Sequence, residues 1–506
     1  MKCNLLATLC ISFMLFSCSK DDEISDSDSE GSLGTSVEID STAITKGQAE
    51  GGTETAADAD DLVEGSVFSS SVQINFGTTI SVDNPLAENG VTITTSGSDV
   101  MIVSNLSEVQ YTISGTTTDG SLKIYSDKKF RLNLNNANIT NNDGPAINIQ
   151  SSKRAFIVLN DNTINTMTDG KSYASSTEDQ KGTIFSEGQL IFSGSGSLSI
   201  KGNYKHAIAS DDYVRIRSGN IDITGAATDG IHSNDAFIAD GGTVKVAATS
   251  DGIEVEKGYV VINDGVFDLN TGDDGIAASY EETDASITPY VTINGGTINV
   301  KSTAGEGIES KSILTINNGN ISTQTTDDGL NAGTAIYING GNIYAYSTGN
   351  DALDSNGIFT ITGGKIVAIG ARAPEASIDC DARTFKITGG ILIGIGGSTS
   401  GPSATPSTVN SVIMGSGSAN QLIHIEAADG TEALTFQAPT AYTTLIYASA
   451  KLKANTTYNV YTGGDVANAV NFNGLFMSGT YTKGTKTGNF STTGRVTQTG
   501  GSISRG

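Results

Sequence analysis

Residues 248–256, ATSDGIEVE, have a near copy in residues 272–280, GDDGIAASY. In both stretches an aliphatic residue directly follows an acidic residue and a glycine. Variants of this arrangement return along the chain every 22 or 23 residues, with two longer steps. Self-similarity at a constant period indicates a stack of equivalent structural repeats. The aliphatic positions of these repeats are Ile208, Ile231, Ile253, Ile276, Ile308, Leu330, Leu353 and Ile378.

A series of glycines has the same period. These glycines close corners of the type Asn-Gly-Gly, as in YVTINGGTINV and IYINGGNIYAY. Around each corner apolar and polar residues alternate, which is the period of a half-buried β-strand. Together with the aliphatic residue after the acidic-Gly pair, this pattern predicts three short strands per repeat. The corner glycines are Gly219, Gly242, Gly265, Gly296, Gly319, Gly341, Gly364 and Gly390.

The repeats predict an all-β protein whose main part, residues 65–400, is a three-sided parallel β-helix with one repeat per coil. Coils would be separated by the interstrand spacing of about 4.8 Å. One coil cannot bury its own core, so stability comes from contacts between neighbouring coils. The segment SYEETDASITP, residues 279–289, is predicted to be a loop outside the stack. Residues 401–506 lack the glycine period and are predicted to form a small C-terminal β-domain or cap.

The N-terminal residues have the pattern of a bacterial lipoprotein signal peptide. Residues 1–17 begin with Lys2, contain an apolar segment and end in Leu-Phe-Ser before Cys18. Cys18 would then carry the lipid, and this anchor is the only membrane contact that we predict. The acidic stretch directly after Cys18 resembles the export signal of lipoproteins displayed on bacterial surfaces. We therefore predict an outer-membrane lipoprotein that is exposed on the cell surface.

Charge is distributed unevenly along the chain. Residues 18–64 contain fourteen acidic residues against Lys20 and Lys46, and such a segment cannot bury enough apolar surface to fold by itself. We predict a disordered acidic tether there. The net charge of the whole chain is -26, which argues against nucleic acid as a partner because no cationic surface is available for phosphates. The folded part remains acidic enough to favour a bound cation.

Acidic residues recur two positions before the aliphatic residue of the repeat, and in several repeats also one position after it. At about 5 Å, neighbouring charges would repel by up to about 3 kcal/mol if the effective dielectric constant is near 20. Ca²⁺ offsets such repulsion and binds six to eight oxygen ligands. Asp-Gly is also typical of a turn in which Asp bonds its own backbone, and one residue can serve both roles. The predicted calcium ligands are Asp229, Asp251, Glu254, Asp273, Asp274, Glu306, Asp327, Asp328, Asp351 and Asp354.

The remaining candidate residues give weaker indications. Histidines 206 and 232 occupy turn positions of the repeat, so we predict a role in the turns, whereas His424 and Cys380 are predicted to pack internally. The lysines of the repeats are not grouped with an arginine. Tyrosine rings can stack on sugar faces. By alternation, four outward-facing tyrosines are candidates for carbohydrate contact: Tyr290, Tyr337, Tyr344 and Tyr346.

Four stretches in this order, NLNNANITNNDGPAINI, SGSGSLSIKGNYKHAIAS, ATDGIHSNDAFIADGGTVKV and TTYNVYTGG, resemble a bacterial family of extracellular carbohydrate-binding β-helix proteins. The resemblance covers roughly residues 65–485. It implies a right-handed parallel β-helix of the pectate-lyase type, bound calcium, and attachment to cellulose or acidic, pectin-like polysaccharide. Asp351-Ala352, in place of an acidic-Gly pair, departs from the repeat. We predict a polysaccharide-binding protein; the alternatives are a calcium-dependent polysaccharide lyase and a surface adhesin or scaffold.

Overall fold

The computed structural model describes residues 35–280 and 284–504. The predicted signal peptide and Cys18 therefore lie outside the described residues. Residues from Ser36 onward form one compact unit. This unit is built from β-strands, with two short 3-10 helices, η1 (Ala59–Asp61) and η2 (Val63–Gly65). Within the described part of the chain, we find no helix with the length and apolarity needed to cross a membrane.

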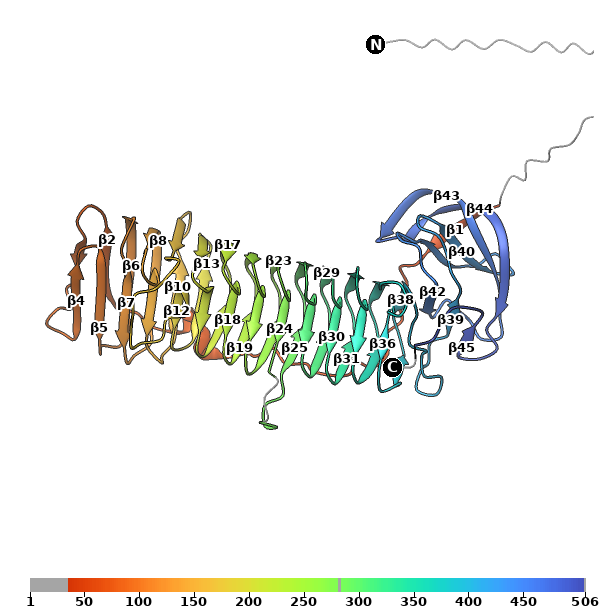
Figure 1. The fold of residues 1–506 in the computed structure, drawn as a ribbon, viewed down its shortest axis with the longest axis horizontal. Helices are drawn as coiled ribbons and strands as arrows, with labels where there is room; N and C mark the ends of the chain where they lie inside the picture. The colour runs from red at the N-terminus through yellow and green to blue at the C-terminus, as the bar shows by residue number, and fades with distance from the viewer. Residues whose placement is uncertain (1–34, 281–283, 505–506) are drawn as a thin grey trace, which may run out of the picture. The chain divides into compact units, whose positions relative to one another are not determined.

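The predicted coils are present and are stacked in register (Figure 1). One face is a sheet of 13 strands, in which all neighbours are parallel except the first pair. Ile231 lies opposite Ile253, and Ile253 lies opposite Ile276, as the sequence alignment predicts. The strands of this first sheet are β4 (Val91–Ser96), β5 (Asp99–Ser104), β7 (Leu122–Ser126), β9 (Ile147–Gln150), β12 (Gly182–Ser186), β15 (His206–Ser210), β18 (Ile231–Ser233), β21 (Ile253–Val255), β24 (Ile276–Ala278), β27 (Ile308–Ser310), β30 (Leu330–Ala332), β33 (Leu353–Ser355) and β36 (Asp379–Cys380).

The second face contains the strands that lead into the glycine corners. Ile262 pairs with Ile293, and Ile293 pairs with Ile316, so this column is also in the predicted register. Its strands are β2 (Ser70–Phe76), β6 (Val109–Thr117), β8 (Phe130–Thr140), β10 (Ala155–Leu159), β13 (Leu190–Gly194), β16 (Tyr213–Ile216), β19 (Ala236–Ala239), β22 (Tyr259–Ile262), β25 (Tyr290–Ile293), β28 (Ile313–Ile316), β31 (Ala335–Ile338), β34 (Ile358–Ile361) and β37 (Phe385–Ile387). The short strand β3 (Ser81–Asp83) pairs with β2.

The third face follows the corners. The long strand β8 contributes to two faces. Its first half pairs with β10 on the second face, and its second half pairs with β11 (Ile164–Thr168) on the third face. Phe267 pairs with Ile298, again as predicted. The further strands are β11 (Ile164–Thr168), β14 (Ser197–Gly202), β17 (Asn220–Ala226), β20 (Thr243–Ala248), β23 (Val266–Thr271), β26 (Thr297–Ser302), β29 (Asn320–Thr325), β32 (Asn342–Ser347), β35 (Lys365–Ile369) and β38 (Ile391–Gly396).

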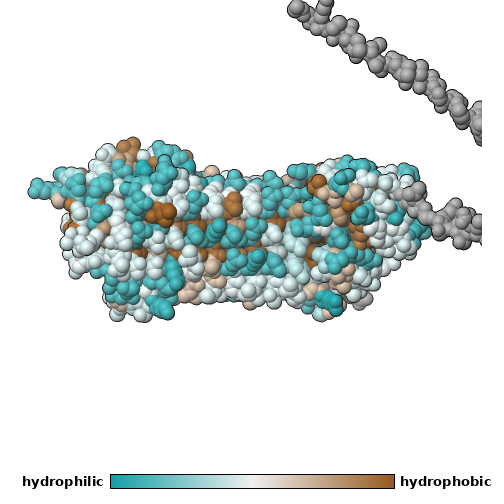
Figure 2. All heavy atoms as spheres, turned by 90° about the horizontal axis from the view of Figure 1, so that it is seen from above, coloured by the Kyte–Doolittle hydropathy of each residue, from teal (hydrophilic) through white to brown (hydrophobic). Residues whose placement is uncertain are grey.

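The glycine corners are required by backbone geometry. Gly296 and Gly341 both have φ of +85°, a conformation that other L-residues rarely adopt. A Cβ atom at Gly341 would also lie 2.7 Å from the carbonyl oxygen of Gly319 in the preceding coil. The coils could not stack this closely with a side chain at that point. Inside the coils, one continuous cluster of buried Ile, Leu, Val and Phe side chains forms the core. Hydrophilic residues cover much of the face shown in Figure 2.

The C-terminal β-domain is present and is joined to the last coil. Strand β42 (Thr444–Ser449) pairs antiparallel with β38, and a second apolar core includes residues of both strands. A five-stranded sheet in the order β1-β44-β41-β40-β43 completes the domain. Its strands are β1 (Ser36–Asp40), β40 (Leu422–Ala427), β41 (Glu432–Gln437), β43 (Thr457–Phe472) and β44 (Leu475–Ser491). Strand β39 (Ser411–Met414) pairs with β42, and β45 (Val496–Gln498) pairs with β39.

The described part of the predicted tether is ordered. Strand β1 pairs with β44. Residues 41–65, which we call the strap, hydrogen-bond to side chains of the second face, including Thr315 and Arg215. The buried carboxylate of Asp61 lies 2.8 Å from Arg154 and 3.2 Å from Arg215. The strap cannot bury an apolar core of its own, but its carboxylates and peptide groups find partners on the β-helix. Composition alone therefore gave the wrong prediction for this part of the tether.

Candidate cation-binding site

The predicted acidic column forms a ladder of carboxylates in the turns before the strands of the first sheet. Asp251, Asp274 and Asp351 are each less than 10% exposed. One oxygen of each carboxylate accepts a hydrogen bond from the next coil. The backbone N–H of Asp274 donates to Oδ1 of Asp251 at 2.9 Å, and that of Glu306 donates to Oδ1 of Asp274 at 2.8 Å. The Asp residues thus tie adjacent coils together, whereas the turn pattern had predicted a bond to their own backbone.

The ladder carboxylates are difficult to ionise. Burial raises the pKa of Asp251 to about 8, and the nearby charges of Asp229 and Glu254 contribute in the same direction. Burial also raises the pKa of Asp328 to about 8, and burial together with Glu306 raises the pKa of Asp274. A cation and a proton are two alternative ways to neutralise such a group. Without a metal, Asp251, Asp274 and Asp328 would retain protons at neutral pH.

Acidic oxygens converge at three points along the described ladder. Within each group, one ligand atom from every residue lies within 4.8 Å of the others. All three groups combine residues from at least two coils, so none of them can form in an isolated repeat. The groups are Asp229, Asp251 and Glu254; Asp251, Asp273 and Asp274; and Asp351, Asp354 and Asp379.

Among the described residues, three predicted ligands lie outside these groups. Asp327 and Asp328 accept hydrogen bonds from the side chains of Asn350 at 2.5 Å and Asn331 at 2.9 Å. Glu306 is linked to the ladder through its backbone N–H. Conversely, Asp379 joins a group although it was not among the predicted ligands. Its column position after Ile378 was the available signal.

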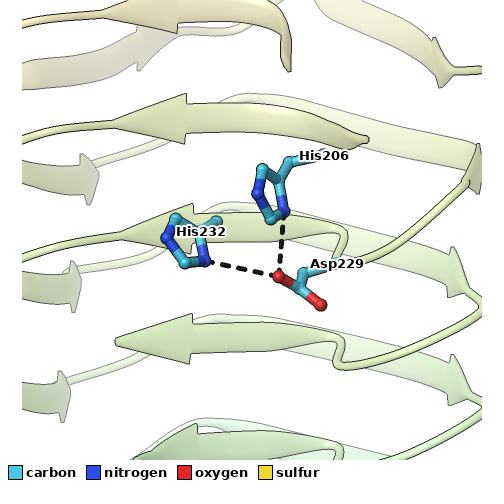
Figure 3. A group of neighbouring side chains, drawn as sticks. All are labelled: His206, Asp229 and His232. Carbon is cyan, nitrogen blue, oxygen red and sulfur yellow. Dashed lines mark ion pairs between the residues drawn. The ribbon is translucent and has the colours of Figure 1, made fainter. Parts of the chain in front are cut away.

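Two histidines extend the first acidic group. In Figure 3, His206 and His232 both point toward Asp229. Their Nδ1 atoms lie 2.8 Å and 3.3 Å from Oδ2 of Asp229, and Nδ1 of His232 also lies 3.0 Å from Glu254. Burial alone would raise the pKa of Asp229, but hydrogen bonds from both imidazoles outweigh it and lower the pKa. The sequence predicted turn positions for both histidines, whereas His206 is the first residue of β15 and His232 is the middle residue of β18. The sequence also did not reveal this convergence.

A cavity of about 730 Å³ lies beside the ladder. Its walls come from the loop after β24, including Asp284 and Pro289, and from Glu306, Glu309 and Lys311. The ammonium group of Lys311 lies 2.6 Å from the carboxylate of Glu309. This cavity therefore offers both charges, together with the hydroxyl-bearing ring of Tyr280, next to the acidic column.

The four candidate tyrosines do not form one surface with the ladder. Tyr290 is stacked on Tyr259 with 4.9 Å between ring centroids, in strands of the second face. Tyr337, also on that face, contacts the strap: a Cβ atom at Gly51 would lie 2.6 Å from its ring. Tyr344 and Tyr346 lie on the third face and pack against the apolar core shared with the C-terminal domain. Their alternation was predicted correctly, but tertiary contacts cover part of these rings.

The fold and the site are those of a parallel β-helix protein that carries a carboxylate ladder beside a cavity. A family model described as carbohydrate-binding domain-containing protein matches residues 87–379, more than half of the chain. The chain belongs to this family.

One relative, a carbohydrate-binding domain-containing protein from Acetivibrio thermocellus, is 32% identical over 118 residues, which is 22% of this chain and 41% of the relative. The match thus spans less than half of the relative's length. A solved structure, the gadolinium derivative of the polysaccharide lyase-like protein from C. thermocellum, has 24% sequence identity and a TM-score of 0.40. That comparison covers 57% of this chain and 96% of the other.

Proposed function

We propose that this protein binds polysaccharide, either cellulose or an acidic pectin-like glycan of plants, with Ca²⁺ held by the carboxylate ladder. Membership in a carbohydrate-binding family supports the ligand class. The observation that supports the cation is the convergence of carboxylate oxygens at Asp251, Asp273 and Asp274 and at Asp351, Asp354 and Asp379. Within these two groups, burial raises the pKa of Asp251, Asp274, Asp351 and Asp354.

The ladder has the donor chemistry that calcium prefers. Carboxylate oxygens are hard ligands, and the turns add backbone carbonyls, so six to eight oxygens can be collected from two coils and water. One oxygen of Asp251 and of Asp274 already accepts a backbone hydrogen bond. The other oxygen of each side chain is left for a cation. Calcium would therefore add to the coil-to-coil contacts without replacing them.

The cavity beside β27 is the proposed contact surface for sugar. Its lining combines carboxylates, which accept hydrogen bonds, with Lys311, which donates them, and with the aromatic ring of Tyr280. A polyuronate carries one negative charge per residue and would be repelled by a protein with a net charge of -26. Calcium bridging protein carboxylates to sugar carboxylates removes this repulsion. Binding of an acidic glycan should therefore depend on calcium more strongly than binding of a neutral glycan.

Affinity electrophoresis tests this proposal with polygalacturonate or a soluble cellulose derivative in the gel. We expect retardation by polygalacturonate that decreases when calcium is chelated and in the double variant Asp251→Asn with Asp274→Asn. The matched control is Asp268→Asn, because Asp268 is an exposed carboxylate on the third face. Equal retardation of all three proteins, with or without calcium, would contradict a role of the ladder.

The same incubation separates the alternatives. Calcium-dependent release of unsaturated products, followed by ultraviolet absorbance, would establish the lyase instead of a binding protein. Neither retention nor product release on any tested glycan would favour the adhesin or scaffold. The balance of charges at Lys311 favours binding, because its ammonium group is engaged by Glu309.

We also propose that the protein is anchored to the outer membrane through Cys18 and faces outward. Support comes from the signal-peptide pattern of residues 1–17 and the acidic stretch after Cys18. Replacing Cys18 by Ser should release the protein into the soluble fraction. Protease added to intact cells should degrade the unmodified protein, and protection until the outer membrane is broken would contradict surface exposure.

A further inference from the structure

One end of the carboxylate ladder has a different donor set from the rest. The chain contains three histidines, and two of them meet at the same carboxylate, Asp229. We propose that His206, Asp229 and His232, completed by Glu254, bind one transition-metal ion of the Zn²⁺ type. This site takes Asp229 and Glu254 from the predicted calcium column, but its two nitrogen donors distinguish it from the other acidic groups of the ladder. It does not depend on the proposed carbohydrate function.

The repeat explains how the imidazoles come together. His206 lies in the column that holds Asp229 in the next coil, because Ile208 pairs with Ile231. His232 lies in the other column, directly opposite Glu254. Both columns carry carboxylates in the later coils, and at this end one member of each column is an imidazole. Two nitrogen donors therefore face two carboxylates across three adjacent coils.

The distances suit a small four-coordinate ion. With metal–ligand bonds of about 2.0–2.1 Å, tetrahedral ligand atoms lie about 3.3 Å from one another. Nδ1 of His206 and of His232 lie 2.8 Å and 3.3 Å from Oδ2 of Asp229, and Nδ1 of His232 lies 3.0 Å from Oε2 of Glu254. Small rotations of these side chains would open the space for an ion.

Donor type distinguishes the metals. Ca²⁺ takes oxygen ligands, whereas imidazole nitrogen is a preferred ligand of Zn²⁺, Cu²⁺ and Ni²⁺. Metal-bound imidazoles usually have a polar partner at the second ring nitrogen. Nε2 of His232 lies 3.8 Å from Oε2 of Glu256, which is close to such an arrangement. The two rings are also stacked, with centroids 4.2 Å apart, which fixes their orientation.

Hydrogen bonds hold the imidazoles in place without a metal. Nδ1 of His206 lies 3.0 Å from the hydroxyl of Thr228, and Nδ1 of His232 lies 3.0 Å from Oε2 of Glu254. An incoming ion would therefore replace contacts that its own ligands already make with one another.

The test is calorimetric titration of the chelator-stripped protein with Zn²⁺, in excess Ca²⁺. We expect one Zn²⁺ per chain. Co²⁺ should give visible absorption bands that Zn²⁺ abolishes and Ca²⁺ does not. The double variant His206→Asn with His232→Asn should bind Zn²⁺ at least about 100-fold more weakly. Asp328→Asn, a ladder residue remote from these imidazoles in sequence, is the matched control and should retain the affinity.

Two results would overturn the proposal. They are Zn²⁺ affinity no higher than that for Ca²⁺, and equal Zn²⁺ affinity in the double histidine variant. If the double variant fails to fold, the cobalt spectrum of the unmodified protein tests the proposal. Excess Ca²⁺ would displace Co²⁺ from a site made of oxygen ligands alone, so loss of the bands on adding Ca²⁺ would contradict the proposal. Loss of polysaccharide binding would leave this result unaffected, so the two proposals can fail independently.

Discussion

Two ladders of polar side chains run along the same coils, and they differ in how the stacked side chains find hydrogen-bond partners. In the glycine corners, the side-chain amides of consecutive Asn residues bond to one another: Asn317 donates to Asn294 at 2.8 Å, and Asn339 donates to Asn317 at 2.8 Å. Their second N–H groups donate to strap carbonyls, with Asn339 reaching Glu50 at 2.7 Å. In the acidic turns, Asp residues stack at the same spacing but share no such bonds with one another.

The difference follows from hydrogen-bonding capacity. An amide has both donors and an acceptor, so a column of amides satisfies itself and only needs the strap at its outer side. An ionised carboxylate has acceptors alone, so a column of carboxylates requires protons or cations from outside. The corner ladder is therefore complete within the chain, whereas the acidic ladder is where we propose that a cation binds. Asn339 and Asp351, both buried, show that burial by itself does not separate the two.

The largest expected effect is on the corner ladder. Asn339→Asp keeps the acceptor but removes the donors to Glu50 and Asn317, leaving two acceptors without partners. We expect the free energy of unfolding to fall by about 3 kcal/mol, measured by denaturant titration. Asn320→Asp is the control, because exposed Asn320 only accepts a hydrogen bond, from Asn342 at 2.7 Å. Equal losses in both variants would mean that the amide donors are not essential.

Neutralising carboxylates of the acidic ladder, by contrast, should not lower the free energy of unfolding in chelator. In Asp251→Asn with Asp274→Asn, the oxygens that accept backbone hydrogen bonds remain, and a neutral amide takes the place of each carboxyl group. In chelator the variant should be at least as stable as the unmodified protein. Calcium at 100 times its dissociation constant should stabilise the unmodified protein by about 2.7 kcal/mol per site.

Melting temperatures with calcium and with chelator measure this effect. The variant should retain only the gain from Asp351, Asp354 and Asp379, and Asp268→Asn should respond like the unmodified protein. A calcium shift of full size in the double variant would assign the cation elsewhere.

Dependence on pH sharpens the comparison further. The folded pKa of Asp251 and of Asp328 is about 8, above the unfolded value of about 3.9. The folded protein therefore binds more protons than the unfolded chain between about pH 4 and pH 8, and this stabilisation is lost as the pH rises through that window. In chelator we expect a slope of about 1.4 kcal/mol per pH unit for each retained proton. Calcium should flatten it, and the Asp251 and Asp274 double variant should show a smaller slope.

The smallest expected change in stability comes from replacing one amide of the acidic columns by a carboxylate. Asn331 occupies a place in the acidic columns and donates to Oδ2 of Asp328 at 2.9 Å and of Asp354 at 3.4 Å. Asn331→Asp replaces this donor by a third carboxylate, so we expect a loss of about 1 kcal/mol in chelator and a larger gain from calcium. Asn318→Asp, on an exposed corner position, controls for the added charge. An unchanged response to calcium would show that amides and carboxylates are equivalent here.

Much of the fold could be read from periodicity. The columns through Ile253, Ile262 and Phe267 lie in the predicted register, because a constant repeat length leaves a stack of coils little choice of pairing. The same alignment predicted the acidic column, but it predicted turn positions for His206 and His232, which lie in β15 and β18. It did not show that both imidazoles reach one carboxylate, since side-chain direction is not a property of the period.

What the sequence by itself determined was the coil, its three strands, its glycine corners and the type of residue in each column. These are local and repeated features, so each copy strengthens the same inference. Only the tertiary structure decided the course of the strap and the partners of the ladders. Asp61 meets Arg154 and Arg215 across distances in sequence that no period describes. Contacts of this kind depend on surfaces that exist only after the coils have stacked.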